Sequence, residues 1–303
     1  MVVTHKYLYA ENSSTPGVSR IWNNDTLSTV PLYSTDNLPP PPQRIGSAGG
    51  KLLIKITHVC NTVLAVGRVI ECFDDGFNLG DIVIGPFGWR DYVLAHATDV
   101  EGIPENEKAD IPRYLALKGS GVIAYHAICK AGQGGTMLID GASCGIAIIA
   151  EQVAALMNWK VWGRSKKDGV MVASATGGCK RVWTETSDIE DMEMVNSVLA
   201  CNGVDKDLAE IMKRGTRLVF CGECETMPET RGMMDERDIK QEKVCFSDLT
   251  KEDKTKAFEA LMKWGDEGKI HVVVDLQNAH FEAIPVIMKA GGVGEIVVEL
   301  RED

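Results

Sequence analysis

The run from Met137 to Gly163, MLIDGASCGIAIIAEQVAALMNWKVWG, constrains the fold of this chain more than any other feature. An apolar strand pattern is followed by a turn of small residues, an amphipathic helix pattern and a second apolar strand. This order predicts a βαβ unit, in which a helix joins two parallel strands. A βαβ unit with a small-residue turn is typical of the start of a dinucleotide-binding domain.

Length and charge set the frame for that unit. The chain has 303 residues, which suits two modest domains, and its hydrophobic share of 45% is ordinary for a globular protein. The formal net charge of −11 leaves no excess of Lys and Arg to displace counterions from a phosphate backbone. The composition therefore argues against a nucleic-acid partner and favours a small-molecule ligand.

Membrane and metal signals are weak in this sequence. No stretch reaches the roughly eighteen apolar residues of a membrane span, and the N-terminus lacks a signal peptide's apolar core, so we expect no membrane partner and a cytoplasmic location. The nine cysteines are scattered and odd in number, which favours free thiols. Cys221 and Cys224 have CxxC spacing, but no second pair accompanies them. We interpret Cys221 as a buried strand residue and expect no metal.

The rest of the chain divides into two patterns. From Gly50 onward, short apolar runs separated by glycines predict a small β-rich unit, and helix patterns follow between Lys108 and Leu138. Later, strands and helices alternate, and the apolar runs at Val195–Cys201 and Thr216–Glu223 lack strict alternation, as expected of parallel strands buried on both faces. Pro285 lies inside a helix pattern and predicts a kink or a helix that restarts there.

The turn of the βαβ unit is the first candidate binding element. It reads Gly141 to Ala147, GASCGIA, and is not the glycine-rich GxGxxG sequence. Small side chains at Ala142, Ser143 and Gly145 would let a pyrophosphate approach the helix N-terminus, although Cys144 crowds the tightest point. The alternative is a strand-to-helix turn that binds nothing.

A basic cluster follows the second strand of the unit. An acidic residue at this position favours a ribose 2′-hydroxyl, whereas Arg164, Lys166 and Lys167 would form charge-assisted hydrogen bonds with a 2′-phosphate. The cluster therefore favours NADP(H) over NAD(H). A solvated charged turn with no ligand is the alternative.

Several segments resemble one family over most of the chain. They are GDIVIGPFGWRDYV, SGVIAYHAI, the run through KVWG, GVDKDLAEIMKRGTRLVFCGE and EGKIHVVVDLQNAHFEAI. Together they resemble the medium-chain dehydrogenase/reductase superfamily and, within it, the zinc-independent double-bond reductases. That branch includes alkenal and prostaglandin reductases and fungal enoyl reductases that act with polyketide synthases.

The resemblance implies an α/β fold with two domains. A Rossmann-type doubly wound parallel sheet is expected over residues 125–269. A GroES-like, β-rich catalytic domain is expected over residues 1–124, completed by residues 270–303. The family often forms dimers through the Rossmann sheet, so a homodimer is a possible assembly.

The resemblance also implies NADPH chemistry without a metal. The nicotinamide hydride adds to the β-carbon of a conjugated enone, negative charge develops on the carbonyl oxygen, and the α-carbon takes a proton. The expected substrate is a small hydrophobic enone or a polyketide-type compound. Gly121, Gly203 and Gly222 are the further positions expected to line the cofactor.

Tyr92 and His126 are the candidate catalytic residues. Tyr92 would donate to the developing enolate oxygen, and His126 stands beside the helix motif that faces the cofactor domain. Each also has a structural interpretation, because a tyrosine on a strand is usually packed and a lone histidine in an apolar helix is usually structural.

Departures from the family pattern favour a second hypothesis, a repurposed enzyme such as a cyclase, isomerase or pericyclase that no longer uses NADPH. Such a catalyst needs an orienting cleft and one hydrogen-bond donor. The substituted positions are Ile123, Cys144, Ala147, Val170 and Glu185. A third hypothesis is a non-enzymatic binding or regulatory protein on the same scaffold.

Overall fold

The computed structural model describes residues 50–166, 169–176, 178–184, 194–222 and 228–301, together with the backbone of 18–23 and 26–31. The chain divides into two compact units. Unit 1 comprises Met1–Leu115, Leu276–Gly291 and Val297–Asp303, and unit 2 comprises Ala116–Asp275 and Gly292–Ile296. The domain boundaries expected from the sequence, 124/125 and 269/270, stay a prediction.

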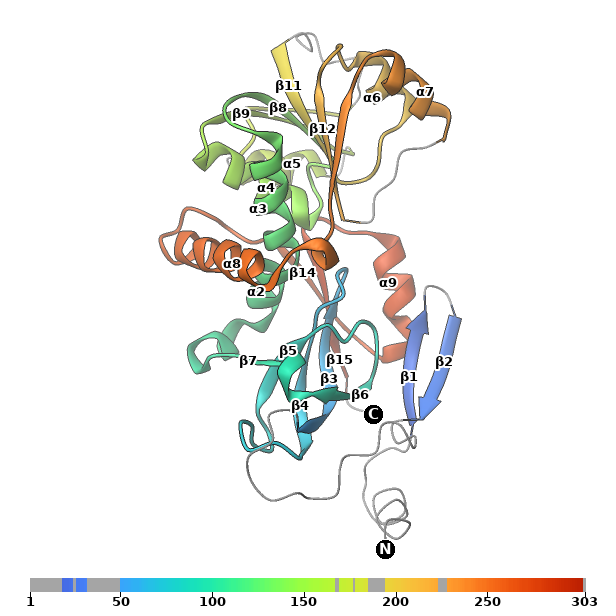
Figure 1. Ribbon diagram of the computed structural model, residues 1–303, viewed down its shortest axis with the longest axis vertical. Coiled ribbons are helices and arrows are strands. Elements are labelled where there is room, and N and C mark those ends of the chain that lie inside the picture. The colour runs from blue at the N-terminus through green and yellow to red at the C-terminus, as the bar shows by residue number, and fades with distance from the viewer. Residues whose placement is uncertain are drawn as a thin grey trace, which may run out of the picture. The chain divides into compact units, whose positions relative to one another are not determined.

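Unit 2 is built on a six-stranded sheet whose neighbouring strands are all parallel. The strand order is β10-β9-β8-β11-β12-β13, so the chain order reverses between β8 and β11 (Figure 1). This is the doubly wound order of a dinucleotide-binding fold, and it confirms the predicted fold class. The strands are β8 (Gly135–Asp140), β9 (Trp159–Arg164), β10 (Arg181–Trp183), β11 (Val195–Ala200), β12 (Arg217–Cys221) and β13 (Lys240–Val244).

Helices cover both faces of this sheet. Successive residues of one strand point to opposite faces, so Met137 and Ile139 pack with α3, α4 and α8, whereas Leu138 packs with α6 and α7. The strands therefore read as continuous apolar runs. The helices are α3 (Val122–Ala131), α4 (Gly145–Leu156), α5 (Val170–Ala175), α6 (Lys206–Ile211), α7 (Pro228–Glu236) and α8 (Lys251–Asp266).

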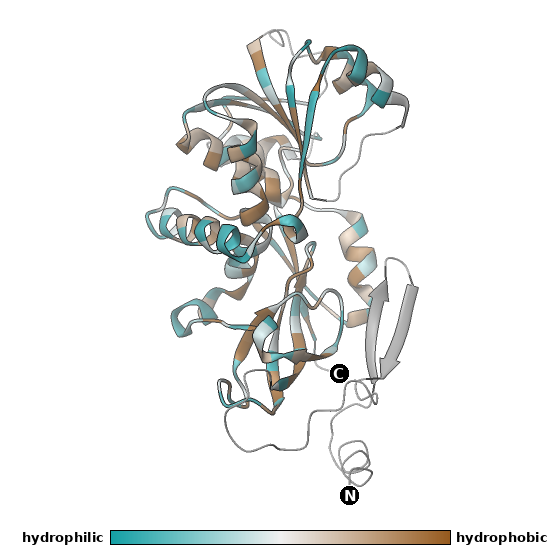
Figure 2. Cartoon of the chain, viewed as in Figure 1, coloured by the Kyte–Doolittle hydropathy of each residue, from teal (hydrophilic) through white to brown (hydrophobic). Residues whose placement is uncertain are grey.

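Helix α8 shows how an amphipathic pattern is used here. Its residues are mostly hydrophilic, as Figure 2 shows. Ala257 and Leu261 are fully buried, and Phe258 and Met262 pack against the same apolar cluster. Thr250 caps the helix by accepting a hydrogen bond from the backbone N–H of Asp253. A narrow apolar face is thus enough to hold α8 against unit 2.

Unit 1 carries a mostly antiparallel sheet in the order β14-β15-β3-β4-β5-β7, with β6 paired to β3. Leu52, Leu53 and Ile54 lie in its central strand and are fully buried. This strand-rich unit agrees with the expected GroES-like part of the fold. Its strands are β3 (Lys51–Cys60), β4 (Ala65–Cys72), β5 (Ile82–Gly85), β6 (Tyr92–His96), β7 (Glu101–Gly102), β14 (Val274–Ala279) and β15 (Glu295–Leu300). A separate hairpin joins β1 (Val18–Asn23) to β2 (Thr26–Pro31).

Two further α-helices lie in other parts of the described chain. Helix α2 (Ile111–Ala116) runs into a π-helical turn at Leu117–Gly121 and then into α3. Helix α9 (Ile284–Ala290) begins beside Pro285, which occupies its first turn. The predicted restart at this proline is confirmed. Within the described residues, no helix is long and apolar enough to cross a membrane.

Candidate functional site

The turn between β8 and α4 lies at the carboxyl edge of the sheet, where the strand order reverses. Gly141 has φ of +77°, a conformation that glycine adopts without strain. The backbone N–H groups of Gly141 and Ala142 both donate to the carbonyl of Arg164, each at 2.9 Å. These two hydrogen bonds hold the residues that follow β8 against the last residue of β9. Helix α4 begins at Gly145, so its N-terminus lies at this edge of the sheet.

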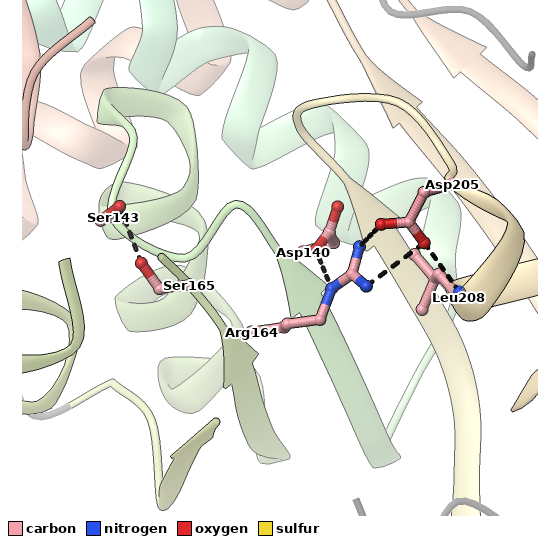
Figure 3. A network of polar contacts seen from close by, with 6 residues as sticks. All are labelled: Asp140, Ser143, Arg164, Ser165, Asp205 and Leu208. Atoms are coloured by element: carbon pink, nitrogen blue, oxygen red, sulfur yellow. Dashed lines mark hydrogen bonds and ion pairs between the residues drawn. The ribbon is translucent and has the colours of Figure 1, made fainter. Parts of the chain in front are cut away.

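Small residues in the turn allow close packing. A Cβ added at Gly163 would lie 2.9 Å from the Cβ of Ala142. The hydroxyl of Ser165 donates to the hydroxyl of Ser143 at 2.8 Å (Figure 3), and Gly169 packs directly against Ser143. Ala142 and Ser143, two expected cofactor positions, thus also hold the turn to the segment after β9.

Arg164, the principal basic candidate, is held by two carboxylates. Its Nε donates to Asp140 at 2.5 Å, and its Nη2 donates to Asp205 at 2.8 Å (Figure 3). Asp205 in turn caps α6 by accepting from the backbone N–H of Leu208. We call these three charged residues the arginine clamp, because they join the ends of β8 and β9 to the start of α6.

Burial and pairing set the protonation of the arginine clamp. Burial raises the pKa of Asp140, which is 5% exposed, although the guanidinium of Arg164 opposes this shift. At Asp205, burial acts in the same direction but is outweighed by hydrogen bonds from Arg164 and from the Leu208 N–H, so the pKa is lowered. The pKa of Arg164 is raised, because the bonds to both carboxylates outweigh its burial. The clamp therefore carries one cation between two acidic groups.

The other basic candidates differ from Arg164. Lys166 is exposed immediately after β9, next to the arginine clamp in sequence. Lys167 lies outside the described residues, as does Glu185. Of the predicted 2′-phosphate ligands, Lys166 is the one whose side chain is described and exposed to solvent.

Two expected glycines lie on loops at the same carboxyl edge. Gly203 follows β11 with φ of +87°, and Gly222 follows β12 with φ of +72°. A Cβ on Gly222 would lie 3.9 Å from Ile146 in the first turn of α4. Asn202, which the sequence analysis missed, packs its side chain against Gly141. Asn202 lies two residues after the end of β11, and this position at the carboxyl end of a parallel strand could have marked it as a site residue.

The expected glycine at 121 has a packing role. It ends the π-helical turn, and a Cβ there would lie 3.1 Å from Leu261 of α8 and 3.7 Å from Ile149 of α4. Gly121 thus allows α4 and α8 to approach the π-helical turn closely. The preceding residue, Ser120, is buried and hydrogen-bonds the carboxyl of Glu295.

The segment Gly292–Ile296 returns to the start of α4. The N–H of Gly294 donates to the carbonyl of Ser143 at 2.8 Å, and Gly294 forms a parallel bridge with Cys144. Glu295 packs against Gly145, where an added Cβ would lie 2.7 Å from the Cα of Glu295. Gly145 is therefore required for this contact, and sequence reasoning did not identify Glu295.

Glu295 is a buried carboxyl group at a helix N-terminus. It is 3% exposed, and its Oε1 has no hydrogen-bond partner among the described residues. Burial raises its pKa to about 7, while the hydrogen bond with Ser120 works in the opposite direction. The group therefore changes charge near neutral pH.

The partly exposed Cys144 lies close to this carboxyl in the turn before α4. A hydrogen bond with Cys201 and burial raise its pKa well above the ordinary value, and the charge of Glu295 adds to the effect. A thiol held in the protonated form is a poor nucleophile. Cys144 therefore fills the start of α4 and does not supply covalent chemistry.

A second buried carboxyl lies further along α4. Glu151 is 0% exposed and accepts a hydrogen bond from Thr176 at 3.3 Å. Gly178 packs against its Cβ, and burial raises the pKa of Glu151 to about 8, opposed by hydrogen bonds from Cys179 and Thr176. We interpret Glu151 as a neutral acid that joins α4 to the segment between α5 and β10.

The two catalytic candidates belong to different units. Tyr92 begins β6 in unit 1, is partly buried, and pairs with Lys55 of β3. His126 lies on α3 in unit 2, and its Nε2 is 3.2 Å from the backbone carbonyl of Asp253 in α8. This contact joins α3 to α8, so it gives His126 a structural role in the packing of the two helices. Among the described residues, no group of three or more His, Cys, Asp or Glu side chains could hold a metal ion.

Comparisons with known proteins agree with the described fold. No family model matches the chain. Prostaglandin reductase 1 from Bos taurus is 25% identical over 263 residues, which cover 77% of this chain and 79% of the relative. The crystal structure of CurA in complex with NADPH from Vibrio vulnificus has a TM-score of 0.68 at 15% identity, covering 96% of this chain and 98% of CurA.

A third similar structure is the CurF ER cyclopropanase from the curacin A biosynthetic pathway. It has a TM-score of 0.63 at 16% identity, covering 94% of this chain and 99% of that chain. The chain therefore shares the fold of these structures, and its sequence similarity to prostaglandin reductase 1 agrees with its resemblance to the medium-chain dehydrogenase/reductase superfamily. The relatives named prostaglandin reductase 1 agree with the branch indicated by the sequence motifs, the zinc-independent double-bond reductases.

We predict that the arginine clamp is a stabilising element. Replacing Arg164 by Met leaves Asp140 buried without its cation, which should lower the free energy of unfolding by about 3–5 kcal/mol. Lys166→Met, at an exposed position two residues later, should change stability by less than about 0.5 kcal/mol. Urea denaturation of the two variants measures the difference. Equal stabilities would show that the guanidinium does not support the fold.

We predict that Glu151 makes the protein less stable as the pH rises. Its pKa is 4.5 when unfolded and about 8 when folded, so between these values the folded state binds more protons than the unfolded state. Stability from this group is therefore lost from pH 4.5 up to pH 8, by a few kcal/mol. Glu151→Gln should match the natural chain at pH 5 and be more stable at pH 8.5, measured by urea midpoints. Parallel pH profiles for both proteins would contradict this.

Proposed function

We propose that the protein is an NADPH-dependent reductase of a conjugated carbon–carbon double bond in a small hydrophobic enone or polyketide-type substrate. The observation that carries the proposal is the turn Gly141–Gly145, which presents the N-terminus of α4 at the reversal point of a doubly wound sheet. This is the place where such folds bind dinucleotides. The similarity to prostaglandin reductase 1 and to an NADPH complex supports the same assignment.

The described residues fit NADPH under one condition. The first turn of α4, from Gly145 onward, offers backbone N–H groups, and a Cβ on Gly222 would meet only Ile146, at 3.9 Å. Lys166 is an exposed cation for the 2′-phosphate. The arginine clamp has its guanidinium committed to Asp140 and Asp205, so we assign Arg164 a positioning role. The condition is that Glu295, which packs against Gly145, is neutral when the phosphates bind.

Tyr92 is the residue that we propose for the chemical step. When bound, NADPH would supply a hydride to the β-carbon of the substrate. Negative charge then develops on the substrate's carbonyl oxygen, and the Tyr92 hydroxyl would stabilise it by donating a hydrogen bond. His126 is the other candidate from the sequence, and its Nε2 lies 3.2 Å from the backbone carbonyl of Asp253.

A second candidate function follows from the acidic groups at the carboxyl edge. Asp140 and Asp205 hold the arginine, and Glu295 occupies the start of α4, so this edge is less basic than its sequence suggests. An enzyme on this scaffold that orients a reactive substrate without NADPH, such as a cyclase, isomerase or pericyclase, is consistent with these contacts. A protein of similar fold is described as an ER cyclopropanase, so the scaffold hosts more than one reaction.

The decisive assay incubates the protein with a panel of small hydrophobic enones, with and without NADPH. The reductase proposal expects loss of NADPH absorbance with one equivalent of saturated product, and no conversion without NADPH. Conversion that is independent of NADPH would support the alternative. Absence of saturable NADPH binding by calorimetry would overturn the reductase proposal.

We predict that Lys166→Glu weakens NADPH binding more than NADH binding. Loss of a charge-assisted hydrogen bond and the added repulsion should raise the Kd for NADPH by roughly 10- to 100-fold, and leave that for NADH nearly unchanged. Lys256→Glu, at an exposed site on α8, makes the same change in net charge and serves as the control. Calorimetry measures both ligands. Equal effects from the two variants would exclude a local role for Lys166.

We predict that Tyr92→Phe lowers kcat without weakening NADPH binding. Removing one hydrogen-bond donor to a developing oxyanion typically costs about 10²- to 10³-fold in kcat. Steady-state kinetics with a reactive enone, combined with the NADPH Kd, separates this effect from misfolding. An unchanged kcat would remove Tyr92 from the proposed mechanism.

A further inference from the structure

The N-terminus of α4 carries an internal carboxyl group. Glu295 is 3% exposed and packs against Gly145, the first residue of this twelve-residue helix. Its Oε2 lies against Gly145, at a helix end that favours negative charge, and its Oε1 lacks a hydrogen-bond partner among the described residues. A carboxyl oxygen buried in this way needs a proton, a water molecule or a ligand as its partner.

Among the described residues, burial and a hydrogen bond with Ser120 are the influences on the ionisation of Glu295, and neither is a cation. The π-helical turn contributes the hydroxyl of Ser120, and the turn before α4 contributes the thiol of Cys144. The backbone carbonyl of Val273 accepts from the N–H of Glu295 at 2.8 Å. Lys118, in the same π-helical turn, has its ammonium 4.5 Å from the centre of the Phe258 ring. Protonation is therefore the available way to neutralise this carboxyl.

A carboxylate and a phosphate compete for the same helix end. Both are favoured by the partial positive charge and the backbone N–H groups of the first turn. In a buried setting two anions this close repel one another, so the occupation of the site by one anion disfavours the other. When neutral, the carboxyl group removes the repulsion and can donate a hydrogen bond to a phosphate oxygen.

We propose that Glu295 is a proton-linked gate of the dinucleotide site, so that a dinucleotide phosphate binds at the start of α4 only when this carboxyl takes up a proton. The proposal rests on the proposed NADPH function and adds a specificity-determining residue to it. When ionised, the Glu295 carboxylate itself occupies the N-terminus of α4 and repels a phosphate. When neutral, it no longer repels the phosphate, which can then bind. The raised pKa of Glu295, about 7, places this exchange in the physiological range.

The coupling has a definite sign. Below pH 7 the carboxyl is already neutral, so NADPH binding needs no proton uptake. Above pH 7 each binding event must take up a proton, and the affinity falls by about tenfold for each pH unit. By reciprocity, bound NADPH raises the pKa of Glu295.

Calorimetry with NADPH tests the proposal on the whole chain. Titrations are run at pH 6 and pH 8, each in two buffers of different ionisation enthalpy, which gives the number of protons taken up. The natural chain is expected to bind about tenfold more weakly at pH 8, with uptake close to one proton there and close to none at pH 6. Glu295→Gln should bind with the same affinity at both pH values.

The matched control is Glu299→Gln. Glu299 lies on the same strand, β15, near His58 of unit 1, and its replacement should leave the pH dependence unchanged. The number of protons taken up by the natural chain on NADPH binding needs no variant, so it tests the proposal even if Glu295→Gln or Glu299→Gln folds poorly.

Two results would overturn the proposal and are distinguishable. Equal affinity at both pH values with no proton uptake by the natural chain would remove the gate, while the NADPH function would stand. No NADPH binding by the natural chain or by Glu295→Gln at either pH would remove both the gate and the proposed function.

Discussion

The return of Gly292–Ile296 to the turn after β8 is the contact on which the candidate site depends. The turn is held from two sides: its N–H groups donate to Arg164 of β9, and its Ser143 carbonyl accepts from Gly294. These two tethers fix where α4 begins and which backbone groups it presents. They also bring Glu295 against Gly145, so the interaction that orders the turn also places an acid at the helix end.

At the carboxyl edge of the parallel sheet, acidic residues lie beside the basic cluster that the sequence shows after β9. The cluster therefore does not present a free guanidinium to an anion. Arg164 lies between Asp140 and Asp205, and its function is to join two strand ends to the start of α6. In the site that we propose, recognition of a phosphate would depend on backbone N–H groups and on Lys166, with Glu295 opposing it when ionised. Such a site binds its ligand through the helix end and depends on pH, whereas a site built on a free guanidinium would not.

Local patterns predicted much of the fold, but they predicted little of the site. The run Met137–Gly163 specifies a βαβ unit by periodicity alone, and Pro285 marks the start of a helix, because both are local effects of chain geometry. Glu295 could not be found this way, since its partner Gly145 lies far away in sequence and only the return of the chain brings them together. The partners of Arg164 are likewise set by strand order, which a sequence pattern does not encode.

The most direct test of the account is the ionisation of Glu295 itself. Carbon NMR of the protein labelled at the glutamate side-chain carboxyl, compared with Glu295→Gln and Glu151→Gln, assigns the two buried groups. The account predicts a resonance, absent from Glu295→Gln, that titrates near pH 7 and moves to higher pH when NADPH is added. A Glu295 resonance that titrates below pH 5, or does not respond to NADPH, would contradict it.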